Sequence, residues 1–205
     1  MRMRTFCLPA LLAVLAFCQN PAAGQEQTKD DFMTPAAQDS LGQIRQSMPR
    51  WTSVNMEISA SQYQQRRRYS ISDPFLRMSM TGDQESDGSF SFSGDAAGQY
   101  LSFSISTEPK GGYNIFGGGL NLWLKRAGGY YMLSGFVGRH NIWLQITPRG
   151  GSYTVLGQMG LSVSVSGTAD NTRVDGSTDL DHFDSADLAV LGATLCALNS
   201  PPPTK

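Results

Sequence analysis

Apolar and polar residues alternate along most of the chain from Trp51 to Val165, in short runs separated by glycine-rich segments. Side chains of a β-strand point alternately to its two faces, so a period of two is typical of strands with one buried face. The runs Phe90–Phe92 and Leu101–Ile105 show this period most clearly, with serine at each polar position. Roughly nine or ten such strands follow one another without helices between them, which predicts a mainly β, antiparallel meander.

Two architectures fit a long meander: a curved sheet that forms a half-barrel or barrel, and a sandwich of two sheets. We favour the curved sheet because glycine lets strands bend and coil, and the chain has 22 glycines. The run Gly117–Gly119 precedes a strand and not a helix, so we interpret it as a bulge or bend rather than a phosphate-binding loop. The polar segment Ala169–Ser177 is predicted to be a loop.

Apolar residues at helical spacing occur on both sides of the strand-rich region. Residues 36–48 follow a threonine and a proline, which predicts a short amphipathic helix. Asp184 is the predicted N-cap of a second helix, which ends at Asn199 before a proline-rich, disordered tail, residues 200–205. Its leucines share one stripe, namely Leu188, Leu191, Leu195 and Leu198. We expect both helices to pack on the sheet, and the second to dock on it or plug one end.

One tetrapeptide pattern occurs twice, as Asn121–Leu124 and Asn141–Leu144, on strands that flank a third at Tyr130–Val137. Alternation puts both tryptophans on the same face as the asparagines, and the aliphatic residues on the opposite face. With one strand between them, the two tryptophans would lie about 9–10 Å apart. We predict a candidate ligand-binding face made of Trp123, Trp143, Asn121, Asn141, Tyr130, Met132 and Phe136.

This face has two interpretations. Small-molecule pockets are mostly apolar with a few oriented polar groups, so the tryptophans would form the aromatic floor of a cavity. Alternatively the face packs under a helix or a second sheet as ordinary core. The two interpretations differ in the stability that a tryptophan-to-alanine change removes, about 3–5 kcal/mol for a core residue and near 1 kcal/mol for an open one.

The first 24 residues are typical of a secretory signal peptide, with a charged start, a short apolar run and small residues before Gln25. We expect cleavage near Gly24–Gln25 and a periplasmic or secreted protein. Cys18 would be acylated in a lipoprotein, but the bulky Phe17 precedes it, so we do not expect a lipid anchor. Residues 25–35 are predicted to be mobile, and residues 36–199 to form a single β-rich domain.

Without the leader, the chain keeps 14 basic and 17 acidic residues, a net charge of −3. This balance argues against nucleic acid as a partner, because binding to nucleic acid depends on cationic side chains that neutralise phosphates. Cys196 is then the single remaining cysteine, so no intramolecular disulfide can form. The domain must therefore be stabilised by its hydrophobic core.

Few residues suggest catalysis or metal binding. The chain has no nucleophile elbow and no phosphate loop, and we expect neither enzymatic activity nor a cofactor. His140 falls in a predicted turn, and the aspartates around His182 lack the ligand spacing of a zinc or calcium site. We interpret that cluster as a polar loop that caps the last helix. Arg66 and Arg68 share one strand face, where they would form a weak anion clamp or protect an edge strand from pairing.

These features predict an exported cell-envelope protein that binds a lipid or another apolar ligand without catalysis. The alternatives are an envelope assembly protein that contacts a protein partner and no small ligand, and a glycan-binding module. An exposed aromatic face favours ligand binding, and a covered face favours the assembly role. The predicted strands have about seven residues, fewer than the roughly 9–11 that cross an outer membrane, so we do not expect an integral membrane protein after removal of the signal peptide.

Overall fold

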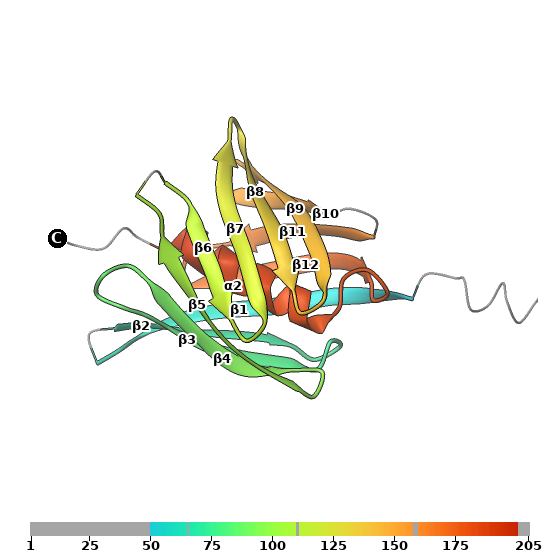
Figure 1. The fold of residues 1–205 in the computed structure, drawn as a ribbon, viewed down its shortest axis with the longest axis horizontal. Coiled ribbons are helices and arrows are strands. Elements are labelled where there is room, and N and C mark those ends of the chain that lie inside the picture. The colour runs from blue at the N-terminus through green and yellow to red at the C-terminus, as the bar shows by residue number, and fades with distance from the viewer. Residues whose placement is uncertain (1–49, 65, 110, 158–159, 201–205) are drawn as a thin grey trace, which may run out of the picture. The chain divides into compact units, whose positions relative to one another are not determined.

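Twelve antiparallel strands form a closed barrel in the computed structural model, which describes residues 50–64, 66–109, 111–157 and 160–200 (Figure 1). Each strand pairs with its neighbours in the sequence, and β1 closes the barrel by pairing with β12. The strands are β1 (Trp51–Tyr63), β2 (Arg66–Asp73), β3 (Met78–Gln84), β4 (Phe90–Ala96), β5 (Gln99–Thr107), β6 (Tyr113–Gly117), β7 (Leu120–Ala127), β8 (Tyr130–Val137), β9 (His140–Arg149), β10 (Ser152–Gly157), β11 (Leu161–Gly167) and β12 (Asn171–Asp179).

The predicted class, a mainly β antiparallel meander rolled into a barrel, is confirmed, and the sandwich alternative is not what forms. The predicted leader, the segment 25–35 and the helix 36–48 lie outside the described residues, as does the tail beyond Ser200. No helix among the described residues is long and apolar enough to cross a membrane.

The alternating pattern separates the inside of the barrel from its outside. In β7, Leu120, Leu122 and Leu124 are buried, whereas the residues between them are exposed. The same split holds in β4 and β5, where the phenylalanines point inward and the serines outward. The predicted division of the Asn-Trp strands into an aliphatic and an aromatic face is therefore correct, and the aliphatic face lines the interior.

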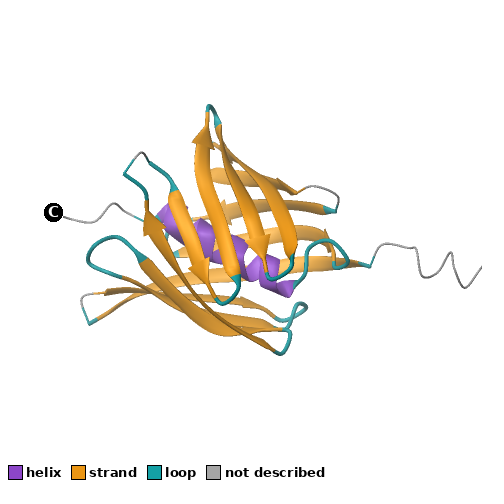
Figure 2. Cartoon of the chain, viewed as in Figure 1, coloured by secondary structure: helices purple, strands orange, loops and turns teal. Residues whose placement is uncertain are grey.

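A single described helix, α2 (Ser185–Asn199), lies inside the barrel (Figures 1 and 2). Every residue from Ser185 to Ala197 is buried, so the burial extends round the whole helix, beyond the predicted leucine stripe. Small residues, most of them apolar, occupy the positions between the leucines, and a helix that is largely apolar all round is buried all round. Gly192 permits the closest approach, because a Cβ there would lie 2.8 Å from the Met56 sulfur and 2.9 Å from an Ile71 methyl.

The cap of this helix is the one predicted from the sequence. The Asp184 carboxylate accepts hydrogen bonds from the backbone N–H groups of Ala186, at 2.8 Å, and Asp187, at 3.1 Å. The Asp187 carboxylate accepts one in return from the backbone N–H of Asp184 at 3.0 Å. This reciprocal arrangement satisfies N–H groups that a helix start otherwise leaves unpaired.

Two strands, β6 and β12, were not predicted from the sequence. The segment 169–177, predicted to be a loop, contributes most of β12, whose buried positions carry threonine, valine and aspartate instead of large apolar residues. The strand β6 is short and lies between glycine runs, and Gly117–Gly119, predicted to be a bulge or bend, ends β6 and forms the turn into β7. Because β2 pairs with β1 and β3, its arginines do not protect a free edge.

Gly135, which faces the interior from β8, supports a first prediction. Its φ of +141° is rarely adopted by other residues, and a Cβ would lie 2.2 Å from the Asn121 carbonyl oxygen. Gly135→Ala should lower the free energy of unfolding by about 1–3 kcal/mol or more, because the backbone must shift. Gly129→Ala is the control, since that turn glycine has open space around it. Urea denaturation of both variants checks this, and equal stability would contradict it.

Candidate functional site on the outer face of the barrel

The residues of the predicted binding face lie on the outside of the barrel, away from its core. Trp123 is 36% exposed and Phe136 is 52% exposed, whereas Trp143 is half-buried. Asn121 and Asn141 are also exposed, and Tyr130 and Met132 are half-buried at the outer surface of β8. The face is therefore neither the floor of an internal cavity nor part of the hydrophobic core.

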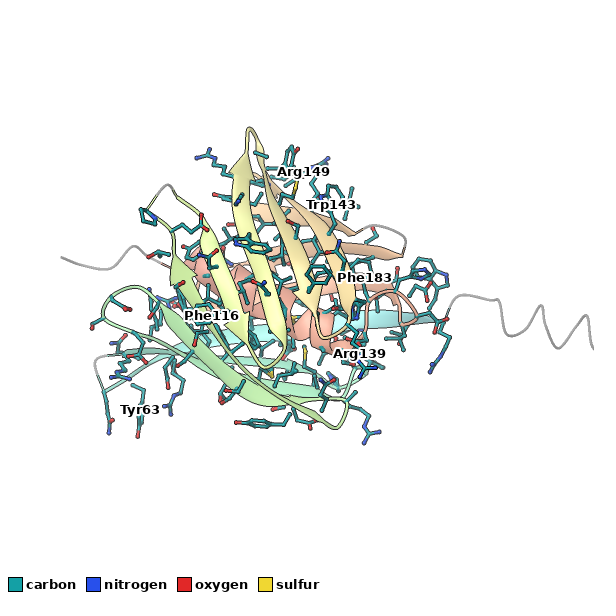
Figure 3. The ribbon with its side chains drawn as sticks, viewed as in Figure 1. Tyr63, Phe116, Arg139, Trp143, Arg149 and Phe183 are labelled. Carbon is teal, nitrogen blue, oxygen red and sulfur yellow. The ribbon has the colours of Figure 1, made fainter. Side chains whose placement is uncertain are left out.

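Strand pairing brings these side chains together in two rows. Asn121, Phe136 and Asn141 are directly paired across β7, β8 and β9. In the next row Ser134 stands between the two tryptophans, Trp123 on one side and Trp143 on the other. Two strand spacings separate the tryptophan backbones, about 9–10 Å, as the sequence predicted. Figure 3 shows Trp143 on β9 of this wall.

The strand β6 extends both rows by one residue each. Phe116, 50% exposed, pairs with Asn121, and Asn114 pairs with Trp123. The Asn114 Oδ1 oxygen is buried and accepts no hydrogen bond from any described residue. We call the combined surface the aromatic face, which consists of Phe116, Trp123, Phe136, Trp143, Asn114, Asn121, Asn141 and Ser134. Phe116 and Asn114 were missed in the sequence because the strand that carries them was missed.

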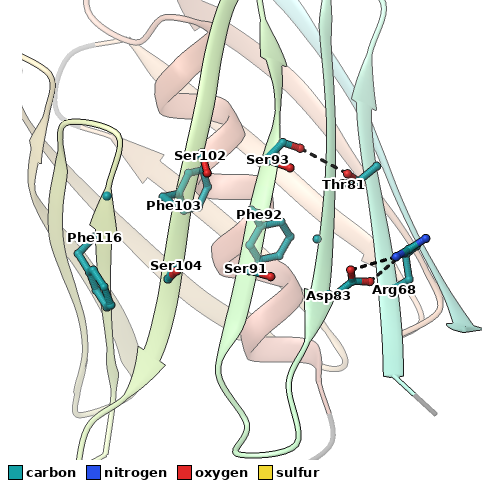
Figure 4. A pocket seen from close by; sticks show the side chains of 12 residues that line it. Arg68, Thr81, Asp83, Ser91, Phe92, Ser93, Ser102, Phe103, Ser104 and Phe116 are labelled. Atoms are coloured by element: carbon teal, nitrogen blue, oxygen red, sulfur yellow. Dashed lines mark hydrogen bonds and ion pairs between the residues drawn. The ribbon is translucent and has the colours of Figure 1, made fainter. Parts of the chain in front are cut away.

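A groove of about 440 Å³ adjoins the aromatic face at Phe116 (Figure 4). Serine side chains of β4 and β5 form its floor, because serine is short where the flanking residues are long. We call it the serine groove, and its lining residues are Arg68, Thr81, Gly82, Asp83, Ser91, Phe92, Ser93, Ser102, Phe103, Ser104, Phe116 and Gly117. The alternation in the sequence predicts that these four serines face outward, but only the strand register shows that they are neighbours.

Arg68 and Asp83 form a two-pronged ion pair at one wall of the serine groove. The Arg68 Nε and Nη2 atoms donate to the two Asp83 oxygens at 2.8 and 3.1 Å. The Tyr63 ring lies 4.3 Å from the guanidinium carbon and supports it from another side. The hydrogen bond from Arg68 lowers the pKa of Asp83, and the same bond raises the pKa of Arg68. Arg66 likewise pairs with Glu85, at 3.0 Å, so each arginine of the predicted anion clamp has a carboxylate partner.

Both histidines of the sequence lie where α2 begins, and each contacts an aspartate. His140, the first residue of β9, places Nε2 2.9 and 3.0 Å from the two Asp187 oxygens, and the Asp187 side chain is fully buried. His182 places Nδ1 2.8 Å from Asp179. Within the described residues no group of three or more histidine, cysteine, aspartate or glutamate side chains is placed to hold a metal ion. These contacts fasten the entrance of α2 to the barrel.

Cys196 lies within α2 and is fully enclosed by the core. Burial raises the pKa of its thiol well above the ordinary range, so the neutral thiol persists at physiological pH. The side chain acts as a small apolar group in the packing of the lumen.

No protein-family model, no curated protein and no solved structure matches this chain.

Proposed function

We propose that this protein is an exported, non-catalytic binding protein that holds a glycan chain on its aromatic face. The observation that carries the proposal is the exposure of Phe116, Trp123 and Phe136 between amide and hydroxyl side chains. Contiguous exposed apolar surface with polar neighbours is typical of interaction sites. A pyranose ring matches this mixture, because its C–H face stacks on an aromatic ring while its hydroxyl groups bond to amides and serines.

The spacing of the rings supports a chain rather than a single sugar. Trp123 and Trp143 stand on either side of Ser134, about 9–10 Å apart. Alternate residues of an extended β-linked glycan turn the same face to a surface at a comparable interval. Rings held on paired strands are also positioned more rigidly than rings on loops, which lowers the entropy lost on binding.

The position of α2 argues against the lipid interpretation in its simplest form. A barrel that carries a lipid needs a lumen to hold the acyl chain, whereas here Leu188, Leu191 and Leu195 of α2 pack within the barrel. The exposure of the aromatic face likewise favours a ligand over an assembly role in which a helix covers it. The glycan interpretation uses the outer surface and leaves α2 in place.

Trp123→Ala should weaken glycan binding at least about tenfold and cost only about 1 kcal/mol of stability, because the ring is partly exposed. Chitotetraose and cellotetraose are suitable extended probes, with maltotetraose as the curved comparison, and binding is followed by calorimetry and tryptophan fluorescence. Trp51→Ala removes an equally large exposed ring from β1, outside the aromatic face, and should bind as the wild type does.

Three outcomes would overturn the proposal. The first is that none of the three probes binds the wild-type protein. The second is that Trp51→Ala weakens binding as much as Trp123→Ala does. A loss of stability above about 3 kcal/mol in Trp123→Ala would also overturn it, because that cost is typical of a buried aromatic residue and not of an open binding face.

A further inference from the structure

The serine groove has a floor of hydroxyl groups that other side chains leave open. Ser91 pairs with Ser104, and Ser93 with Ser102, so four serines form two adjacent pairs on β4 and β5. None of the four hydroxyls makes a hydrogen bond to another residue that the structure describes, and Thr81 bonds only weakly, at 3.5 Å to the Ser93 carbonyl. Each hydroxyl can donate one hydrogen bond and accept others. The floor is therefore suited to a ligand that itself carries many hydroxyl groups.

The two walls of the groove differ in chemistry. Phe116 stands on β6 at one side and is half exposed, and the Arg68–Asp83 pair stands at the other (Figure 4). The outward row runs Asp83, Ser91, Ser104 and Phe116, three strand spacings or about 14 Å from wall to wall. This width accommodates a sugar ring, with one wall to stack on its C–H face and the other to bond its hydroxyls.

The Arg68–Asp83 pair makes the groove neutral and still rich in hydrogen-bonding groups. A guanidinium has five N–H donors, of which two are used on Asp83. The carboxylate also keeps lone pairs beyond those two bonds. Arg68 and Asp83 are the only charged residues among those that line the groove, and their charges cancel. An ionic ligand would meet a like charge as well as an opposite one, so a neutral polyhydroxyl ligand fits better than a phosphate or a carboxylate.

The groove is continuous with the aromatic face through Phe116. That residue pairs with Ser104 on one side and with Asn121 on the other. The outward row from Asp83 to Phe136 crosses five strand spacings, about 24 Å, without a change of face. A ligand that lies along this row would contact serines, then Phe116, and then the asparagine-aromatic rows.

We infer that the serine groove is a further subsite for a neutral sugar residue of the same glycan, with Phe116 as the stacking wall and Arg68 and Asp83 as hydrogen-bonding partners of its hydroxyls. This inference rests on the proposed function and narrows its ligand to a neutral, extended chain of several sugars. A disaccharide occupies either the groove or the aromatic face, whereas a longer chain contacts both.

Ser104→Leu tests the subsite, because a leucine on the floor fills the groove without touching the core. Binding of chitobiose and chitohexaose is measured by calorimetry. The wild-type protein should bind the hexasaccharide at least about tenfold more tightly than the disaccharide, and Ser104→Leu should lose most of that difference. Asp83→Asn, which keeps the side-chain shape but not the charge, should weaken hexasaccharide binding in the same direction. Ser162→Leu makes the same change on the outer face of β11, away from the groove, and should bind as the wild type does.

The outcomes separate this inference from the proposed function. One outcome is that Trp123→Ala abolishes binding while Ser104→Leu and Asp83→Asn still bind the hexasaccharide more tightly than the disaccharide, as the wild type does. In that case the subsite is wrong and the proposed binding at the aromatic face is kept. If no chito-oligosaccharide binds, both fail. Oligogalacturonate of the same length tests the charge class, and binding as tight as that of the neutral hexasaccharide would overturn the neutral assignment.

Discussion

Leu191→Ala should lower the free energy of unfolding by about 2–5 kcal/mol, the range for a large apolar side chain truncated in a close-packed core. Leu191 is fully buried in α2, with the barrel wall around the helix. The wall is a closed ladder of strands, so it has little freedom to collapse onto the space that the leucine leaves. The loss should therefore fall in the upper part of the range, as measured by urea denaturation.

Leu156→Ala is the matched control, because it removes the same atoms from the outer face of β10, where the side chain is 47% exposed. Its cost should be below about 1 kcal/mol. Similar losses in the two variants would mean that α2 does not fill the lumen in solution. Different slopes of the two denaturation curves would instead indicate that Leu191→Ala loosens the native barrel.

Asp187 should make the protein less stable as the pH rises from about 4 to about 6. Burial raises the pKa of this carboxyl from 3.8 to about 6, with the nearby Asp184 carboxylate acting in the same direction and His140 opposing both. Between these values the folded state binds more protons than the unfolded state, so the free energy of unfolding falls with rising pH. The contribution is fully present below pH 3.8 and lost above pH 6, at most about 3 kcal/mol in total.

The measurement compares the free energy of unfolding of the wild-type protein and of Asp187→Asn across this pH range. Other carboxyl groups titrate in the same range, and their contributions cancel when one profile is subtracted from the other. The amide that replaces the carboxylate keeps an oxygen for the Asp184 N–H, so the helix cap survives. Among the described residues, the ionisable groups around this end of the helix are Asp184, His140, Asp181 and the His182–Asp179 pair. His140→Gln should move the fall in the free energy of unfolding to higher pH, since it removes the partner that favours the ionised carboxyl of Asp187. Parallel pH profiles for wild type and Asp187→Asn would contradict the assignment.

The period of two explains why so much of the barrel could be predicted from the sequence. It depends only on local alternation, and it placed Trp123 with Asn121 and Leu122 opposite them. It does not tell which face is inside, because both faces of β7 and β9 carry large apolar side chains. Only the closed barrel and α2 decide that, by filling the space on the leucine side.

The strand β12 was missed because its sequence lacks a clear alternation of apolar and polar residues. Its buried positions include Thr172, Thr178 and Asp179, and this polar set makes the segment resemble a loop. Gly176 is required there, since a Cβ at that position would lie 2.2 Å from the Ser162 carbonyl oxygen. The serine groove could not be predicted from the sequence for another reason. It depends on the register between strands and not on a motif within a single strand.

The closure of the barrel determines the order in which the chain can fold. Trp51 of β1 pairs with Asp179 of β12, and α2 follows β12 in the chain. A nascent chain that ends before Ser185 therefore lacks the helix that covers its apolar inner face, whatever number of hairpins it has made. Contacts between such distant segments make folding slow, and the open intermediate exposes apolar surface and unpaired strand edges. We expect a single late folding step, in which lumen filling and β1–β12 pairing occur together, and dependence on chaperones until that step is complete.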